Sequence, residues 1–474
     1  MSTSSSDHTF AAHPHSQGDV EKGFQHQNSA TELTSMGKPE KGSLSQQQQP
    51  QGVQSDASAP ATSQPAPAAP RMPTFPDGGL KAWSVVFGAF LAMCVTLGAV
   101  ISFTVFQEYY FRVTLSTRSQ DAIAWIGSVQ LACTFGMTLP AGILNNKFGP
   151  RITIAIGTVL VVLGNMTASA SKEYYQFFLS QGLCAGFGYG LVLLPALATP
   201  AEWFLAKRGL ATALAVGGSS VGGVFFPVMV NRLLNFDDVS LGWTLRAIAF
   251  VQLGGLLVAI ALIQDRFPKG GAPLPFKDYF SPRTTNCFMF GGMLLYLGQY
   301  IPYFFITPYG VYRGASPSMA FYFASILNGS TFFGRLVLGT LADRVTGHFN
   351  TLAATTAITG LLAFVMTAAS SNAAIIVWAA FYGFFSGAIQ SLFTPALARL
   401  AGSPQKIGGF LAIGSSLMWP FLLVSEPIAG KLLQNTGNTN FVQMTIFAGV
   451  VCMAGGIMLL ASRLLLPGAK TLKA

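Results

Sequence analysis

The stretch "GTLADRVTG", residues Gly339–Gly347, ends a long apolar run and contains an aspartate, an arginine and two glycines. Glycine readily ends a helix, and a carboxylate next to a cation forms a polar turn that can bond the exposed end of a neighbouring helix. A related stretch, "GILNNKFG", begins at Gly142 after an earlier apolar run. For either copy alone, an ordinary helix stop with loop charges that mark orientation is the alternative interpretation.

Two further pairs of short stretches recur at nearly the same spacing. "PALA" at Pro195–Ala198 returns at Pro395–Ala398, and "GSS" at Gly218–Ser220 returns at Gly414–Ser416. One match could arise by chance among so many small residues. Three matches at a shared offset of about 200 residues indicate an internal duplication, so we expect two halves of the same orientation.

The composition is that of a membrane protein. The 474 residues are 51% hydrophobic and only 9% charged, and a soluble chain could not cover so much apolar surface. A membrane-spanning helix needs about 20 mostly apolar residues. We expect twelve such segments, at residues 80–106, 122–145, 151–170, 175–200, 208–231, 243–263, 284–309, 318–342, 351–371, 375–399, 408–432 and 441–465.

Residues 1–76 are rich in Ser, Gln, Pro and Ala and offer too little apolar surface to fold, so we expect a disordered cytosolic tail. This tail lacks a basic start followed by an apolar core, and no cleaved signal peptide is expected. The predicted organisation beyond it is an N-terminal six-helix half (77–263), a cytosolic central loop (264–283), a C-terminal six-helix half (284–466) and a cytosolic C-terminal tail (467–474).

The net charge of +10 is better explained by orientation in a membrane than by nucleic-acid binding. With the N-terminus in the cytosol, the even-numbered connections carry 11 Lys and Arg residues and the odd-numbered connections carry 6. We therefore predict that both termini are cytosolic. The plasma membrane is the default location, and a vacuolar or other internal membrane is the alternative.

The duplicated polar turns resemble the loop motif of the major facilitator superfamily. The resemblance implies an all-α integral membrane protein with twelve transmembrane helices in two six-helix halves, and turns that help latch the halves in one of two access states. The first copy has Asn146 where that family usually has an aspartate, so we expect the second latch to be stronger. The matching positions are Gly142, Asn146, Lys147, Gly149 and Arg151 in the first copy and Gly339, Asp343 and Arg344 in the second.

Two other stretches carry a narrower resemblance. "PDGGLKAW", Pro76–Trp83, enters the first span, and "WFLAKRGLATALAVGG", Trp203–Gly218, joins the fourth span to the fifth. Both resemble signatures of the monocarboxylate transporter family, and the tail and short central loop resemble its fungal members. From chemistry alone, Asp77 suits the N-terminal amides of the first helix and Trp83 suits the membrane interface. The matching positions are Asp77, Gly78, Gly79, Trp83, Phe204, Lys207 and Arg208.

An ionisable side chain inside a span is a functional candidate, because burying it costs about 2.5–3.5 kcal/mol. Arg335 is such a cation in the eighth span, and Glu426 is the acidic residue placed well inside a span. Their depths differ by about 15 Å at the helical rise, so we expect no direct pair. Arg335 either binds a polar or anionic substrate or bonds backbone carbonyls and water. Glu426 either titrates with transport or bonds to Arg246, Lys431 or loop amides.

The family resemblance sharpens the question about Arg335. Proton-coupled lactate carriers of the family have an aspartate one turn before this arginine and a lysine in the first span. Here the corresponding positions are Thr331 and Ile101 with its apolar neighbours. Standard proton–lactate symport is therefore not expected. We predict that a negatively charged or strongly polar substrate satisfies Arg335, with Asn328 about two turns away on the same face.

Aromatic and amide side chains recur at helical spacing in the seventh span, which lines the cavity in the superfamily that the chain resembles. Tyr300, Tyr303 and Gln299 are candidate contacts for a ring-bearing solute, together with Tyr296. The alternative is that these side chains face lipid or neighbouring helices.

No nucleophile with a base, metal-ligand cluster or phosphate loop occurs, so we expect no enzyme, no catalytic residue, no metal and no cofactor. We interpret the chain as a monomeric secondary active transporter of a small organic metabolite that works by alternating access in a lipid bilayer, with protons as candidate coupling ion. Fungal relatives suggest monocarboxylate uptake, vitamin uptake or export of a secondary metabolite of a biosynthetic gene cluster, and the missing lysine and aspartate favour the last two. A non-transporting nutrient sensor is the rival from another class.

Overall fold

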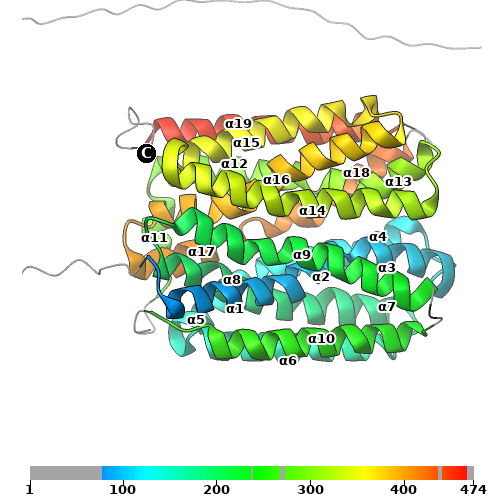
Figure 1. Cartoon of the computed structure of the whole chain (residues 1–474), viewed down its shortest axis with the longest axis horizontal. Helices are drawn as coiled ribbons and strands as arrows, with labels where there is room; N and C mark the ends of the chain where they lie inside the picture. Colours follow the sequence, from blue (N-terminus) through cyan, green and yellow to red (C-terminus); the bar gives the residue numbers. More distant parts are fainter. Residues whose placement is uncertain (1–76, 236, 238, 267–272, 436–439, 467–474) are drawn as a thin grey trace, which may run out of the picture. The chain divides into compact units, whose positions relative to one another are not determined.

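The computed structural model describes residues 77–235, 237, 239–266, 273–435 and 440–466. All the regular structure in these residues is helical, and the helices lie side by side along one direction (Figure 1). The tails predicted at residues 1–76 and 467–474 lie outside the described residues.

A first set of helices, blue to green in Figure 1, packs through contacts such as those of α1 with α9 and α6 with α10. Its members are α1 (Leu80–Val95), α2 (Leu97–Ile101), α3 (Phe103–Tyr109), α4 (Gln120–Gly136), α5 (Thr138–Phe148), α6 (Pro150–Ala168), α7 (Tyr174–Phe177), α8 (Gly186–Trp203), α9 (Arg208–Asn235) and α10 (Leu241–Leu262).

A second set, yellow-green to red, packs through contacts of α14 with α16, α12 with α19 and α15 with α19. A short helix, α11 (Phe276–Phe280), precedes this second set in the chain. The members of the second set are α12 (Arg283–Gln299), α13 (Ile301–Tyr312), α14 (Pro317–Leu341), α15 (His348–Val365), α16 (Asn372–Leu400), α17 (Ile407–Ser416), α18 (Trp419–Gln434) and α19 (Val442–Leu464).

Among the described residues, 11 helices are long and apolar enough to cross a membrane. The 25-residue α14 is not one of them, but its length of about 37 Å exceeds a hydrocarbon core of about 30 Å. Counting α14, each of the twelve predicted segments corresponds to a helical segment of the structure. The predicted all-α membrane fold is confirmed.

Proline breaks two of the long segments. The helix stops at Gln299 and resumes at Ile301 because Pro302 has no N–H to donate to the carbonyl four residues earlier. A second break separates α17 from α18, just before Pro420. These breaks let side chains within one segment point in directions that a straight helix would not allow.

The two sets meet along lines of helix contact that include α9 with α14, α5 with α17, α4 with α18, α9 with α16 and α8 with α17. Close approach depends on small residues at the first two lines. A Cβ added at Gly142 of α5 would lie 2.5 Å from Cβ of Ala412, and one added at Gly339 of α14 would lie 3.0 Å from Cβ of Ala213. Both glycines belong to the repeated polar turns, so the two copies occupy equivalent places against the opposite set.

Candidate functional site

Arg335 lies on α14, and its guanidinium bonds to two other helices. Nε donates to the carbonyl of Gly387 on α16 at 3.1 Å. Nη1 donates to the carbonyl of Val216 on α9 at 2.9 Å and to the hydroxyls of Ser219 and Ser220. The side chain therefore ties together one helix of the first set and two of the second, and only 4% of it is exposed.

The charge of this guanidinium has no acidic partner in the described part of the chain, where no carboxylate makes an ion pair with Arg335. The second terminal nitrogen, Nη2, makes only a longer contact, 3.3 Å to Oε1 of Gln390. Carbonyls, hydroxyls and an amide satisfy hydrogen bonds without neutralising the charge. A buried positive charge of this kind is a physical basis for binding an anion.

Tyrosines surround the Gln390 side of this cation. The rings of Tyr296 and Tyr300 have centroids 6.2 Å apart, and those of Tyr300 and Tyr303 are 5.7 Å apart. Nε2 of Gln390 donates to the Tyr300 hydroxyl at 3.5 Å, so Gln390 links Arg335 to this ring. The Tyr300 and Tyr303 side chains are buried. They gather here because the break before Pro302 lets α12 and α13 present their aromatic residues to one place.

Gln299 and Tyr303 both bind Ser386 on α16. Nε2 of Gln299 donates to the Ser386 carbonyl at 3.0 Å, and the Tyr303 hydroxyl hydrogen-bonds to the Ser386 hydroxyl at 3.0 Å. The other amide atom of Gln299, Oε1, is buried with no hydrogen-bond partner among the described residues. Together with Arg335, Gln390 and the tyrosines, this unsatisfied oxygen completes a polar and aromatic cluster that we call the central cluster.

Asn328 is the one predicted substrate contact that the structure does not bring to the central cluster. Its side-chain amide donates to the Ala324 carbonyl one turn earlier at 3.1 Å and lies against Gly223 of α9. Thr331, at the position of the family's aspartate, bonds instead to the Ser220 hydroxyl and to the carbonyl of Asn328. Helical spacing placed Asn328 on the correct side of α14 but did not reveal that α9 covers it.

The second polar turn caps the start of α9. Asp343 Oδ1 accepts the backbone N–H of Gly209 at 2.9 Å, and Oδ2 accepts that of Leu210 at 2.8 Å. His348 Nε2 also lies 3.0 Å from Oδ1 of this aspartate. Arg344 is exposed. The carboxylate therefore satisfies free amides at a helix N-terminus in the opposite set.

The first polar turn makes a different set of contacts. Arg151 donates to the carbonyls of Ile263 and Ala261, each at 3.0 Å, at the end of α10 in its own set. Lys147 is exposed and lies over the Phe148 ring. The two copies still share one backbone feature. Gly149 and Gly347 follow their helices with positive φ angles, 82° and 75°, which an L side chain rarely adopts.

The two stretches of the narrower resemblance contact each other. Asp77 Oδ1 accepts the backbone N–H of Leu205 at 2.6 Å and that of Ala206 at 2.8 Å, and the rings of Trp83 and Phe204 are 4.9 Å apart. The expectation that Asp77 binds the amides of its own helix is wrong. The carboxylate binds the loop before α9 instead of the start of α1. The loop amides need such an acceptor because no helix has yet begun there to supply carbonyl partners.

The remaining signature residues lie at the same junction. Arg208 is buried, and its Nε donates to the Phe204 carbonyl at 3.0 Å, whereas Lys207 is exposed. Gly79 takes a positive φ of 90° just before α1, and Gly78 has open space where a Cβ would stand. The signature thus builds the connection between the start of α1 and the start of α9.

Glu426 lies where α18 meets α4. Its Oε2 accepts a hydrogen bond from the Ser128 hydroxyl at 3.1 Å, and its Oε1 is buried without a hydrogen-bond partner among the described residues. The partners predicted from the sequence are wrong, since Arg246 donates instead to Ser169 and stacks over Trp243. As predicted from depth, Glu426 makes no ion pair with Arg335. The carboxyl group therefore joins the two sets of helices through a single hydroxyl.

No group of three or more His, Cys, Asp and Glu side chains within the described residues is placed to hold a metal ion. The chemistry on which the central cluster can draw is one guanidinium, amides, hydroxyls and aromatic rings. Such groups bind and orient a solute.

Comparison with known proteins identifies the family. The sequence pattern described as Major Facilitator Superfamily matches residues 85–421, which is most of the chain. The chain belongs to the major facilitator superfamily. It is a membrane transporter, and the resemblance drawn from the duplicated polar turns is confirmed.

Several curated fungal members of the superfamily are similar over most of their length. The aspyridones efflux protein of Emericella nidulans is 37% identical over 399 residues, covering 84% of this chain and 81% of that protein. The agnestins efflux protein of Paecilomyces divaricatus is 36% identical, with 81% and 88% covered. The fujikurins efflux protein of Gibberella fujikuroi is 35% identical, with 84% and 86% covered.

Solved structures of the superfamily share the fold at low sequence identity. The human organic anion transporter MFSD10 aligns with a TM-score of 0.63 at 13% identity, covering 80% of this chain and 99% of that chain. A proton:xylose symporter aligns with a TM-score of 0.65 at 14% identity, covering 80% and 95%. At these identities the likeness concerns the fold alone.

The sequence also held a signal for cluster residues that we did not predict. Ser219 and Ser220 belong to the repeated "GSS" stretch, which was interpreted only as a mark of duplication. Gln390 lies five residues before the repeated "PALA" on α16 and had no distinguishing pattern. In this member of the superfamily, small hydroxyl residues of one set hold the arginine of the other.

Proposed function

We propose that this transporter exports a small organic anion, of the secondary-metabolite class, by alternating access. The observation that carries the proposal is the buried guanidinium of Arg335, which no carboxylate neutralises among the described residues. A transported acid supplies the opposite charge at Nη2, and the tyrosines contact its apolar or ring-bearing part. The efflux names of three relatives that cover most of the chain support the direction.

We also propose that the chain belongs to the fungal monocarboxylate-transporter-like branch of the superfamily. The contact of Asp77 with Leu205 and Ala206 supports this, because it joins the two signature stretches at one place in the fold. Thr331 in place of the family's aspartate argues against proton-coupled lactate transport within that branch. We therefore propose that the chain shares its origin with this branch, and that Thr331 in place of the aspartate reflects a different substrate.

The proposed transport cycle involves two rigid halves, the helix sets at 77–263 and 284–466, which rock about the central cluster. The capped start of α9 and the close packing of α5 on α17 hold the halves together at one end. We propose that this end faces the cytosol, with both chain termini, and that a monomer works in the plasma membrane.

Glu426 is the proposed coupling residue. It is 5% exposed, and the helices packed against α18, namely α4, α12, α13 and α19, carry their described Lys, Arg, Asp and Glu side chains only near their ends. A carboxyl group in such surroundings is costly to keep charged unless it is paired. Glu426 bonds to Ser128 of the other set. Protonation of Glu426 would therefore change the strength of a hydrogen bond between the two sets.

A metabolite-export assay with Arg335→Lys tests the proposal. Lysine keeps the positive charge but has no counterpart of Nη2, the nitrogen at which we propose that the transported acid binds. We expect export of an organic acid to fall by about tenfold or more, since the loss of one charge-assisted hydrogen bond of about 1.5–3 kcal/mol is enough for this. Membrane abundance and thermal unfolding must stay near those of the wild type.

The matched control is Tyr309→Phe, which removes a buried hydroxyl whose hydrogen-bond partners, Ala369, Thr367 and Arg313, lie outside the central cluster. It should leave export within about twofold. Export that is equal in the wild type, Arg335→Lys and the control would contradict an anion-binding role for Arg335.

A further inference from the structure

Gln299 is the last residue of α12, and its side-chain amide lies against α16 in the central cluster. Nε2 donates to the Ser386 carbonyl at 3.0 Å, whereas Oε1 has no hydrogen-bond partner within the described part of the chain. Only 3% of the residue is exposed. A buried acceptor that meets no donor destabilises the folded state, so such an atom calls for an explanation.

The orientation of this amide is fixed by its bond to α16. If the amide were turned over, Oε1 would face the Ser386 carbonyl oxygen at bonding distance. Two oxygens that carry only lone pairs repel each other, whereas Nε2 has a proton to donate there. Oε1 is therefore the atom that points away from α16, and it can only accept.

The three hydroxyls that bind around Gln299 cannot supply the missing donor, because each has one proton and that proton is already used. The Tyr382 hydroxyl donates to the backbone carbonyl of Gln299 at 2.8 Å, and the Ser386 hydroxyl donates to the Tyr382 carbonyl. The Tyr303 hydroxyl must then be the donor in its 3.0 Å bond to the Ser386 hydroxyl. Rotating these hydroxyls cannot satisfy Oε1 without breaking another bond.

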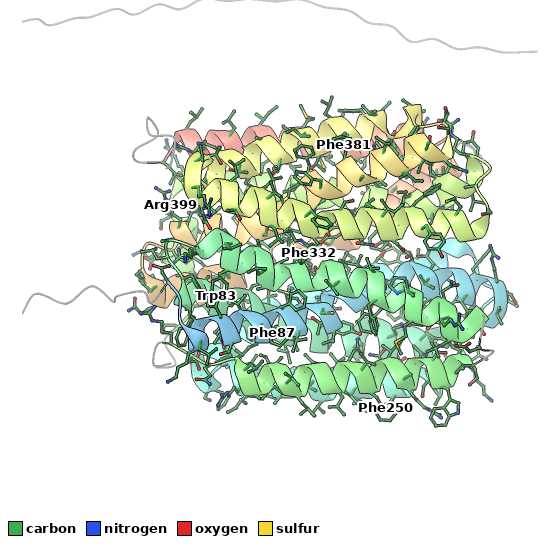
Figure 2. The ribbon with its side chains drawn as sticks, in the orientation of Figure 1. Trp83, Phe87, Phe250, Phe332, Phe381 and Arg399 are labelled. Carbon is green, nitrogen blue, oxygen red and sulfur yellow. The ribbon has the colours of Figure 1, made fainter. Side chains whose placement is uncertain are left out.

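The helix α16 brings Gln299 and Arg335 to the same place. The carbonyl of Ser386 accepts from Gln299, and the next carbonyl along the chain, that of Gly387, accepts from Nε of Arg335. Consecutive Cα atoms are about 3.8 Å apart, so the two side chains end beside one turn of α16. Phe381, earlier on the same helix, is instead 55% exposed (Figure 2).

Two kinds of group therefore meet in the central cluster. Nη2 of Arg335 is a charged donor, and the Tyr300 hydroxyl accepts from Gln390 and keeps its own proton to donate. Both suit the acidic group of a solute. Oε1 of Gln299 repels such a group and suits an N–H or O–H. An acid whose remaining atoms are all apolar would satisfy the donors and leave this acceptor unsatisfied.

We propose that Gln299 determines specificity by accepting a hydrogen bond from a hydroxyl or N–H group of the transported acid. The inference rests on the proposed function and narrows its substrate class to acids that carry such a donor apart from the acidic group. A site built to bond a solute hydroxyl rejects the analogue that lacks it, because the buried acceptor is then left without a partner.

The experiment measures equilibrium binding to the full-length protein in liposomes. The probes are the ortho, meta and para isomers of hydroxyphenylpropanoic acid and their methyl ethers. Each ether keeps the ring and the charge of its acid but replaces the donor with an acceptor. We expect at least one hydroxy acid to bind about tenfold or more tightly than its own ether.

Two matched variants assign this preference to Gln299. Gln299→Met keeps a side chain of similar length without the amide, and we expect the preference to fall to about twofold or less. The control is Gln130→Met on α4. Gln130 is also 3% exposed, and its Nε2 also donates to a backbone carbonyl, that of Gln181 at 2.8 Å. It should keep the preference, and the thermal unfolding midpoints of both variants show whether they have folded.

Equal binding of every hydroxy acid and its ether by the wild type would overturn the role of Gln299, and this comparison needs no variant. A preference that survives in Gln299→Met would overturn it as well, because the donor would then bind elsewhere.

Methyl esters of the hydroxy acids keep this proposal apart from the proposed function, since they retain the donor and lose the charge. Acid binding that weakens in Arg335→Lys but shows no preference for the hydroxyl overturns the role of Gln299 alone. Esters that bind as tightly as the acids, with a preference that depends on Gln299, support that role and overturn the proposed anion transport.

Discussion

At the scale of single residues, Arg335 is held in place by neutral groups. A backbone carbonyl from each of two helices and the hydroxyls of Ser219 and Ser220 fix the guanidinium. An aspartate at position 331 would place a carboxylate one helical turn from the guanidinium. With Thr331 there, the site keeps a charge that is stabilised in position yet free to interact with a solute.

Asp343 provides the first residue-scale prediction. Asp343→Asn leaves one oxygen to accept the amides of Gly209 and Leu210 and removes the charge that favours a helix N-terminus. We expect a loss of stability of about 1 kcal/mol and a larger population open at this end. Thermal unfolding and spin-label distances between α9 and α14 measure the two effects.

Asn146→Ala in the first polar turn is the control for Asp343→Asn. Asn146 carries no charge, so its replacement should have the smaller effect on both measurements. An equal or larger effect of Asn146→Ala would show that the second latch is not the stronger one.

Some residue roles could be predicted from the sequence and others could not. Tyr300, Tyr303 and Gln299 were predicted from their spacing within one span, and the structure brings them together beside Arg335 across the break before Pro302. Asp77 and Glu426 found partners 128 and 298 residues away. Such partners depend on which helices become neighbours, and one sequence does not specify this.

At the scale of elements, the helices could be predicted closely because hydrophobic runs and polar interruptions determine where a chain can cross a bilayer. The pairing of helices could not, since small residues occur on most faces. The duplicated polar turns are an intermediate case. Their glycines marked the places where α5 meets α17 and α14 meets α9, but only the structure identified the opposing alanines.

Exchanging a methyl group between α5 and α17 tests this close contact. Gly142→Ala places a Cβ 2.5 Å from that of Ala412, so the helices must separate, and we expect a destabilisation of about 1–3 kcal/mol. Adding Ala412→Gly removes the opposing methyl group and should restore most of the stability. Thermal unfolding of both single variants and the double variant gives the coupling. Additive effects would contradict a direct contact between the two positions.

At the scale of the whole molecule, the two sets of helices are joined at separate places by different chemistry. One end is held by capped amides and tight glycine packing. Glu426 and Ser128 join α18 to α4, and Arg335 joins α14 to α9. A transporter that rocks between two states must break and remake such contacts, so a proton on Glu426 and an anion at Arg335 can each bias the same movement.

Glu426→Gln tests the coupling role, since glutamine keeps an oxygen for Ser128 but cannot exchange a proton. We expect export driven by a proton gradient to be lost while exchange of labelled for unlabelled solute continues. Ser128→Ala removes the hydrogen bond and keeps the carboxyl group, so it should retain the gradient dependence. Unchanged gradient-driven export by Glu426→Gln would leave Glu426 a purely structural role.

The most direct test of the central claim is to give Arg335 a partner within the protein. Thr331→Asp restores a carboxylate one turn away, and Thr331→Asn is its neutral control of the same shape. Binding and export of an organic acid are measured for both in liposomes. Our account predicts that Thr331→Asp weakens binding by about tenfold or more and that Thr331→Asn stays close to the wild type, because only the aspartate competes with the solute for the charge. Equal binding by the two variants would contradict the claim that a transported anion neutralises Arg335.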